Sequence, residues 1–354
     1  MTTLTTSTAA PESPPPAPRR GRRMRRDAAA GWLFLAPSIA VLGLFLVLPV
    51  FMAFWVSVSD WTGRGSPLSG RVGFVGADNY AALITEPGLA QTNFGTSVRN
   101  NLYFVLMVVP LQTALALLLA VVLNQRTLAG RSFFRTAFYF PTVTSSVAIS
   151  VVFLFLFSST GSVNAVLGLL GLPGPAWFAD PRGVLHLLLG VFGVDGAPTF
   201  LQAQVLGVSL WDWLAGPSVA MCAVIFLVVW TSTGAFMLMF YAALQNLPVS
   251  VSEAAMIDGA TGWQAFWRVT LPQLRSTLFL VLTLGLIGTW HVFDQIYVLG
   301  KGAPGGTTLT PAFLSYVESF ISGNWGQGAA ISFLLFAIIV VLTLLQRFVL
   351  RERR

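Results

Sequence analysis

Apolar residues in this chain gather in long blocks instead of alternating with polar ones, and polar, glycine-rich segments separate the blocks. A helix needs about 20 apolar residues to cross the hydrocarbon of a bilayer, and six blocks reach that length. They cover residues 32–58, 102–123, 137–157, 219–244, 278–299 and 329–349. The pattern predicts an all-α membrane protein with six transmembrane helices, in which Pro37 and Pro49 are tolerated irregularities of the first.

Charge is sparse and mostly positive: 9% of the 354 residues are charged, 55% are hydrophobic and the net charge is +7. With the N-terminus inside, fifteen of the 20 basic residues fall on the cytoplasmic side, and Arg64, Arg71, Arg99, Arg182 and Lys301 remain outside. Because basic residues near membrane helices favour the cytoplasm, both termini are expected there. Lipid orientation thus explains the charge better than nucleic-acid binding.

Residues 1–31 are rich in Thr, Ser, Pro and Arg and cannot bury a core. This composition predicts a disordered basic tail in the cytoplasm, whose positive charge helps to fix the orientation of the first span. An anionic-lipid contact and a twin-arginine export signal are the alternatives, but the following apolar block has no small-residue cleavage site at its end.

A polar island, residues 248–275, separates the fourth and fifth blocks. Ser250 and Glu253 have capping-box spacing, so a short helix is expected to start there and to end in a left-handed turn at Gly259. Ala254 and Ala255 share a face with Val251 and Asp258, and small side chains would let another protein approach closely. The alternative interpretation is that these alanines contact no partner and only raise the helix propensity of the segment. A second helix is predicted over residues 261–268, with Pro272 stopping it.

This island carries a family resemblance. Glu253 to Ala255, then Gly259, then Val269 to Pro272 resemble the EAA motif of permease subunits of binding-protein-dependent ABC importers, with Val269 where isoleucine is usual. The flanks resemble the sugar branch of that family, whose first permeases include those for maltose and glycerol 3-phosphate. These flanking segments are residues 242–248, 257–260 and 293–299. The resemblance covers roughly residues 32 to 350.

The resemblance implies the type I ABC importer permease fold, with short cytoplasmic coupling helices between spans four and five. It also implies a bacterial plasma-membrane complex containing a second homologous permease, two ATP-binding subunits that bind ATP and Mg, and an extracytoplasmic solute-binding protein. The cargo would be a sugar, an oligosaccharide or glycerol phosphate. The residues it assigns to ATPase coupling are Glu253, Ala254, Ala255, Asp258, Gly259, Leu271 and Pro272.

Residues 182–217 are longer than the family pattern requires and are interpreted as an extracytoplasmic insertion. Its apolar run over residues 184–194 is too short to span, so a surface-lying or re-entrant helix is expected. The segments starting at Gly161 and Gly183 match at an offset of 22. Duplication and chance both remain open, since Gly and Leu are abundant here.

A solute pathway is predicted along the fifth span. Gly285, Gly288, Thr289 and Val292 form a stripe beside Trp290, His291, Asp294 and Gln295, and the fourth span adds Thr231, Ser232, Thr233 and Gly234. Rings with hydrogen-bonding groups suit a polyhydroxylated solute, and resemblance to the maltose permease implies a sugar site between these helices. Alternatively, the glycines serve helix packing, and His291 and Asp294 pair with the neighbouring permease.

The sequence argues against catalysis and a resident cofactor. With two histidines and one cysteine, no zinc cluster or Cys-His pair can be assembled. The single lysine, Lys301, precedes Gly302, which rules out a Gly-Lys-Ser/Thr phosphate loop. A transport subunit that hydrolyses no ATP itself is therefore expected. The alternative is a stand-alone secondary transporter or channel, but only Asp294 is a deeply placed carboxylate, and no repeat relates the two halves.

Overall fold

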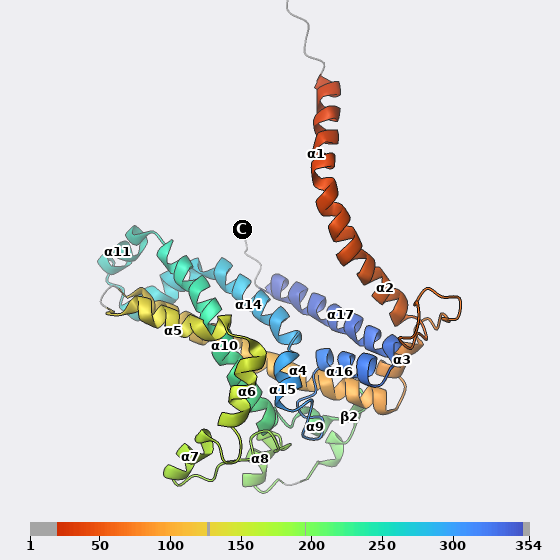
Figure 1. Ribbon diagram of the computed structural model, residues 1–354. Coiled ribbons are helices and arrows are strands. Elements are labelled where there is room, and N and C mark those ends of the chain that lie inside the picture. The colour runs from red at the N-terminus through yellow and green to blue at the C-terminus, as the bar shows by residue number, and fades with distance from the viewer. Residues whose placement is uncertain (1–19, 126–127, 195, 350–354) are drawn as a thin grey trace, which may run out of the picture. The chain divides into compact units, whose positions relative to one another are not determined.

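The computed structural model describes residues 20–125, 128–194 and 196–349, almost all of them in helices or tight turns. Two units are distinguished, Met1–Ala53 and Phe54–Arg354. The first holds helix α1 (Arg20–Leu42), the π-helical turn η1 (Gly43–Val47) and the start of α2 (Leu48–Ser57) (Figure 1). The predicted disordered tail is wrong for residues 20–31, where arginine, methionine and alanine favour helix. Residues 1–19 lie outside the described part.

Two prolines lie just after π-helical turns. The Leu48 N–H donates to the Gly43 oxygen, one residue further back than in an α-helix, and Pro49 follows. The Leu271 N–H donates to the Phe266 oxygen in the same way, just before Pro272. Because proline lacks an N–H and its ring clashes with the carbonyl four residues back, the wider turn accommodates it. The helical segment that contains Pro272 ends one residue later, at Gln273, close to where the sequence predicts the stop.

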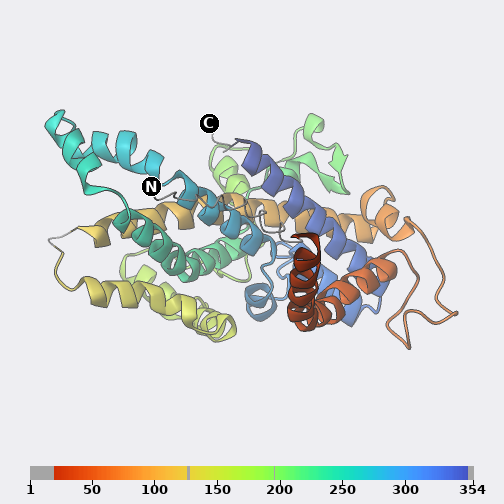
Figure 2. The same ribbon diagram turned by 90° about the horizontal axis from the view of Figure 1, so that it is seen from above.

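The second unit is built on two long helices, α4 (Leu89–Asn124) and α10 (Val219–Gln245), which lie side by side in both ribbon views (Figures 1 and 2). One apolar cluster joins Phe104 and Val108 of α4 to Met221 of α10, and another joins Ala116 and Ala120 to Phe240. At 36 residues, α4 is about 54 Å long. It therefore begins well before the predicted span at residues 102–123.

Three further helices surround this pair: α5 (Arg131–Val143) packs on α10, α14 (Arg275–Trp290) packs on α4, and α17 (Trp325–Val349) packs on α14 and shares an apolar cluster with Val105 and Val109 of α4. Glycine permits the closest approach, because a Cβ at Gly234 of α10 would lie 2.2 Å from the Phe138 oxygen of α5. Beside it, the Thr142 hydroxyl donates to the Thr231 carbonyl at 2.7 Å. Packing of this kind through small residues and hydroxyls is typical between membrane helices.

Two predicted straight spans are broken. The predicted helix at residues 137–157 bends by 98° between α5 and α6 (Ser146–Leu156), where Thr144 is extended and the Ser145 side chain caps α6. The predicted helix at residues 278–299 ends at Trp290, and α15 (Asp294–Leu299) follows after three non-helical residues. A further bend of 69° precedes α14. Apolar periodicity alone does not reveal such bends.

Within the described residues, four helices are long and apolar enough to cross a membrane, and six result if each bent pair forms one span. The four are Ala30–Ser57, Leu89–Asn124, Val219–Gln245 and Trp325–Phe348; the pairs are Arg131–Val143 with Ser146–Leu156 and Gly262–Gln273 with Arg275–Trp290. The second pair draws its first half from the polar island, and α14 itself begins at Arg275, three residues before the predicted fifth span.

The remaining elements are short. They are α3 (Asp78–Ile84), α7 (Ser162–Leu169), α8 (Val184–Val191), η2 (Thr199–Leu201), β1 (Gln204–Val205), β2 (Val208–Ser209), α9 (Leu210–Trp213), α11 (Val249–Ile257), α12 (Gly262–Ala265), η3 (Phe266–Thr270), α13 (Leu271–Gln273), α16 (Pro311–Tyr316) and η4 (Val317–Ile321). β1 and β2 form an antiparallel hairpin.

The predicted insertion folds against the start of α4. The hairpin turn lies so close that a Cβ at Gly95 of α4 would sit 2.1 Å from the Leu206 oxygen. Helix α8 has eight residues, too few to span a membrane. The 22-residue match extends to structure: α7 and α8 are equally long, each is preceded by glycine, and Gly171 and Gly193 both have positive φ.

The α5–α10 contact predicts a difference between two glycines. Gly234→Ala should lower the melting temperature of the purified permease, since overpacking typically costs 1–3 kcal/mol, on the order of several degrees. Gly288→Ala is the matched control, because no atom lies within 4 Å of its added Cβ. Equal melting temperatures for the two variants, measured in the same detergent, would contradict the close contact.

Candidate functional site

A cleft of about 260 Å³ opens where the predicted fifth span breaks. Its lining comes from the end of α14, the break itself, the start of α15 and one residue each of α4 and α10: Phe104, Val228, Gly288, His291, Val292, Phe293, Asp294 and Gln295. The break frees a main-chain carbonyl at Val292, and the buried Thr310 hydroxyl donates to it at 3.2 Å. The irregular backbone is thus satisfied beside the cleft, as an apolar environment requires.

The two helix breaks meet at one carboxylate. Asp294 is in the first turn of α15, and Ser146, the first residue of α6, donates its hydroxyl to Asp294 Oδ2. An anionic side chain is stabilised near helix N-termini, where main-chain N–H groups lack partners. Asp294 therefore links α6 to α15, which also pack on each other, while remaining exposed on the cleft.

The structure brings five of the residues predicted along the pathway to the cleft: Gly288, His291, Val292, Asp294 and Gln295. His291 and Asp294 are exposed, whereas the Val292 side chain is buried. Gly288 has open space around it. These residues come from both sides of the helix break, so they do not form the continuous helical stripe that the sequence predicts.

The other predicted pathway residues lie in helix contacts away from the cleft lining. The buried Gln112 side chain accepts a hydrogen bond from Ser232 at 2.5 Å, and a Cβ at Gly285 would lie 2.5 Å from Gln112 Nε2. The Thr289 hydroxyl is buried and donates to the Gly285 oxygen. Thr231 and Gly234 lie at the contact with α5. All of these residues therefore serve helix packing, which is the alternative that the sequence leaves open.

Sequence reasoning missed Phe104, Gln112 and Ser146. Ser146 belongs to the hydroxyl run at residues 142–146, for which helix packing is the simpler expectation. Phe104 and Gln112 lie on α4, whose apolar pattern marks no face for a solute. Each of these residues gains its place from a contact with a helix far along the chain: Phe104 with the break, Gln112 with Ser232, and Ser146 with Asp294.

The polar island folds into α11, α12, η3 and α13. The predicted capping box is wrong: Pro248 is the N-cap of α11 without a side-chain bond, which puts Ser250 inside the first turn. A capping box occurs instead at Thr261 and Gln264. The left-handed turn at Gly259 is confirmed by its φ of 78°. The Ala260 and Gly259 N–H groups donate back to Ala255 and Met256, closing a Schellman motif.

The exposed surface of this island differs from the predicted one. Ala255 is only 9% exposed, whereas Glu253, Ala254 and Asp258 are exposed. Of the two alanines predicted to contact a partner, only Ala254 is thus accessible. Ile257 and Trp263 are 85% and 71% exposed, respectively. The island therefore exposes one of its two motif alanines and two large apolar side chains.

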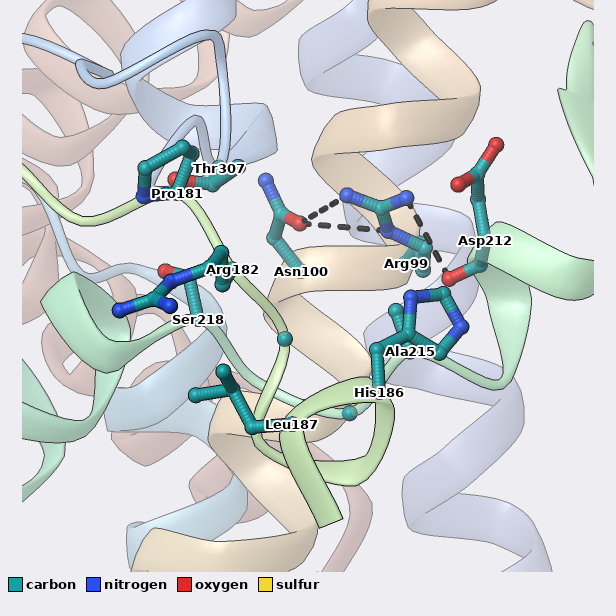
Figure 3. Close-up of a pocket in the computed structure, with 12 residues that line it drawn as sticks. Arg99, Asn100, Pro181, Arg182, His186, Leu187, Asp212, Ala215, Ser218 and Thr307 are labelled. Atoms are coloured by element: carbon teal, nitrogen blue, oxygen red, sulfur yellow. Dashed lines mark hydrogen bonds between the residues drawn. The ribbon is translucent and has the colours of Figure 1, made fainter. Parts of the chain in front are cut away.

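A second cavity, of about 330 Å³, lies between the start of α4 and the predicted insertion (Figure 3). We call it the insertion pocket. Arg99 on α4 donates from Nε and Nη2 to Asn100 Oδ1 and from Nη1 to the Asp212 main-chain oxygen. His186 of α8 stacks on Trp211 and lies 3.1 Å from its main-chain oxygen. Near the pocket, hydrogen bonds from the Arg182 guanidinium lower the pKa of Asp180 below its usual range.

A family model described as binding-protein-dependent transport system inner membrane component matches residues 89–354. The chain belongs to this family. The permease is 31% identical to the lactose transport system permease protein LacF of Rhizobium radiobacter, over 92% of this chain and 95% of that protein. It is 30% identical to the trehalose/maltose transport system permease protein MalF of Thermococcus litoralis, over 93% and 96% of the two chains.

Solved structures agree on the fold. A bacterial ABC transporter involved in the import of the acidic polysaccharide alginate contains a chain that superposes with a TM-score of 0.70 at 21% identity, covering 93% of this permease and 98% of that chain. The predicted family is therefore confirmed, and the permease is a multi-pass membrane protein with an ABC importer permease fold.

The link between the two breaks can be tested by a double-mutant cycle. Ser146→Ala and Asp294→Ala should each lower the melting temperature, and together they should be non-additive by on the order of 1 kcal/mol, since both remove one charge-assisted bond. Ser146→Ala with Asp212→Ala is the control, because the Asp212 carboxylate accepts from Ser209 instead. Full additivity in the first pair would contradict the link.

Proposed function

We propose that this permease is the transmembrane subunit of an ATP-driven importer that moves a carbohydrate through the cleft at the broken fifth span. The observation that carries the proposal is the combination of the EAA-like island with that cleft. Relatives named for lactose, for trehalose and maltose, and for arabinooligosaccharides support a carbohydrate as the cargo class.

The chemistry of the cleft fits such a solute. The half-buried Phe293 supplies a ring, and His291, Asp294 and Gln295 supply donors and acceptors, while the fully buried Phe104 closes the cleft from behind. Sugars present apolar ring faces and many hydroxyls, so they bind where both kinds of group meet. Gly288 leaves the open space that a ring needs at this position.

The rest of the complex follows from the family resemblance. A second homologous permease completes the pathway, and two ATP-binding subunits hold ATP and Mg. An extracytoplasmic solute-binding protein delivers the solute. Both termini face the cytoplasm, so α11 and α12 face the ATP-binding subunits with Ile257 and Trp263 exposed toward them. Closure of those subunits moves the island and, through the 69° bend before α14, the broken span.

The pathway is tested by filling the cleft. Gly288→Trp should abolish uptake in proteoliposomes, because the indole would occupy the open space beside His291. Copurification with the ATP-binding subunits and basal ATP hydrolysis should stay unchanged. Gly288→Ala should transport normally, since its Cβ meets no atom within 4 Å. Normal uptake by the Gly288→Trp variant would show that the solute does not pass through this cleft.

Coupling is tested at the Gly259 turn. Gly259→Val puts a β-branched residue at a φ of 78°, a strain of order 1–3 kcal/mol, and should sharply reduce solute-stimulated ATPase activity. Gly262→Val is the matched control, because a Cβ added at either glycine meets no atom within 4 Å and only Gly259 has positive φ. Equal stimulation in both variants would exclude a role for this turn in coupling.

A further inference from the structure

We propose that the insertion pocket binds a single carboxylate group, held by Arg99. The proposal rests on the proposed function only for orientation, which places the pocket on the extracytoplasmic side. The carboxylate has two possible sources, an acidic side chain of the solute-binding protein or a free carboxylate in solution. The chemistry is the same for both, and the experiment distinguishes them.

Arg99 is a half-buried cation that contacts only neutral oxygens in the part of the chain that the structure describes. Its three hydrogen bonds go to the Asn100 amide oxygen, at 3.3 and 3.0 Å, and to the Asp212 main-chain oxygen, at 3.4 Å. The single ion pair found among the described residues joins Arg182 to Asp180. A guanidinium has five N–H donors, so two of those of Arg99 remain free.

The guanidinium is held in place before any ligand arrives. The buried Asn100 uses its Nδ2 group to bond the main-chain oxygens of Gly306 and Leu309, at 2.8 and 3.0 Å. Its amide oxygen is therefore fixed toward Arg99. A preorganised arginine loses little entropy when it binds a carboxylate, which matches its planar donor geometry.

The other walls add more donors than acceptors. Arg182 bonds Asp180 through Nε and Nη2, which leaves Nη1 free. The Ser218 hydroxyl accepts from the Met221 N–H, so its own proton is available. Asp212 is the one carboxylate among the lining residues, it is exposed, and Ser209 already donates to it.

The charge balance selects the class of ligand. Asp180 largely neutralises Arg182, and Asp212 partly offsets Arg99 through space, so the pocket has free donors but little surplus positive charge. A single carboxylate can use those donors through the planar guanidinium, whereas a phosphate dianion would lose more hydration to gain the same hydrogen bonds. The floor, formed by Asn100, Gly183, Gly216 and Ser218, is buried, and the rim at Pro181, Arg182 and Asp212 is exposed (Figure 3).

The experiment places a carboxylate inside the pocket. Thr307 lines it and is half-buried, so Thr307→Glu should reach Arg99, and Thr307→Gln is the matched neutral control. Both variants keep Arg99 and its contacts. They are compared in the assembled complex in nanodiscs, by thermal shift with sodium acetate against sodium chloride at equal ionic strength, and by the affinity of the solute-binding protein. Arg99→Lys, which keeps the charge but loses the planar donor pair, is a second variant.

If acetate raises the melting temperature of the parent and of Thr307→Gln but not of Thr307→Glu, the site binds free carboxylate. If acetate has no effect but Thr307→Glu weakens the solute-binding protein tenfold or more relative to Thr307→Gln, and Arg99→Lys weakens it too, the carboxylate belongs to that protein. If neither measurement separates glutamate from glutamine, the proposal is overturned. The parent should assemble with the ATP-binding subunits and hydrolyse ATP in the same nanodiscs, and failure of the parent in either measurement would contradict the proposed function instead. Both Thr307 variants should match the parent in these two measurements.

Discussion

Main-chain polar groups need partners wherever water is absent, and this constraint governs the whole helical unit. Irregular backbone inside a membrane protein survives only where another group takes the freed carbonyl or N–H. Thr310 does so at Val292, and at the α5–α6 break the Ser145 side chain accepts from the Ala148 N–H. The turn before Pro272 widens because this residue has no N–H to donate, and the helix ends one residue after it, at Gln273. Because the breaks depend on such bonds, the cleft between α14 and α15 depends on them too.

The sequence predicts much of this molecule because the strongest signals in it are local. Four of the predicted spans, at residues 32–58, 102–123, 219–244 and 329–349, overlap single apolar helices, and Gly259 adopts the expected positive φ. The breaks at Thr144 and His291 could not be predicted, since their stability comes from residues far along the chain. The Ser146–Asp294 bond joins positions 148 residues apart, and the start of α11 depends on how Pro248 follows α10.

The sequence predicted which kinds of residue line the candidate site better than it predicted where each residue lies. The sequence identifies Gly288, His291 and Asp294 as a polar group within an apolar block, and they line the cleft. Ser232 and Gly285 carry the same pattern but contact Gln112. Glycines and hydroxyls serve helix contacts and open space equally well, so residue type cannot separate the two roles.

The exposed apolar side chains of the polar island have a consequence for biogenesis. Ile257 and Trp263 are largely accessible in the isolated chain, and apolar groups left in water favour aggregation and recognition by chaperones and proteases. In the proposed complex the ATP-binding subunits would cover these side chains, so an unassembled copy of this subunit would present them to the cell's proteases. Correct assembly and protection from degradation would then depend on the same surface.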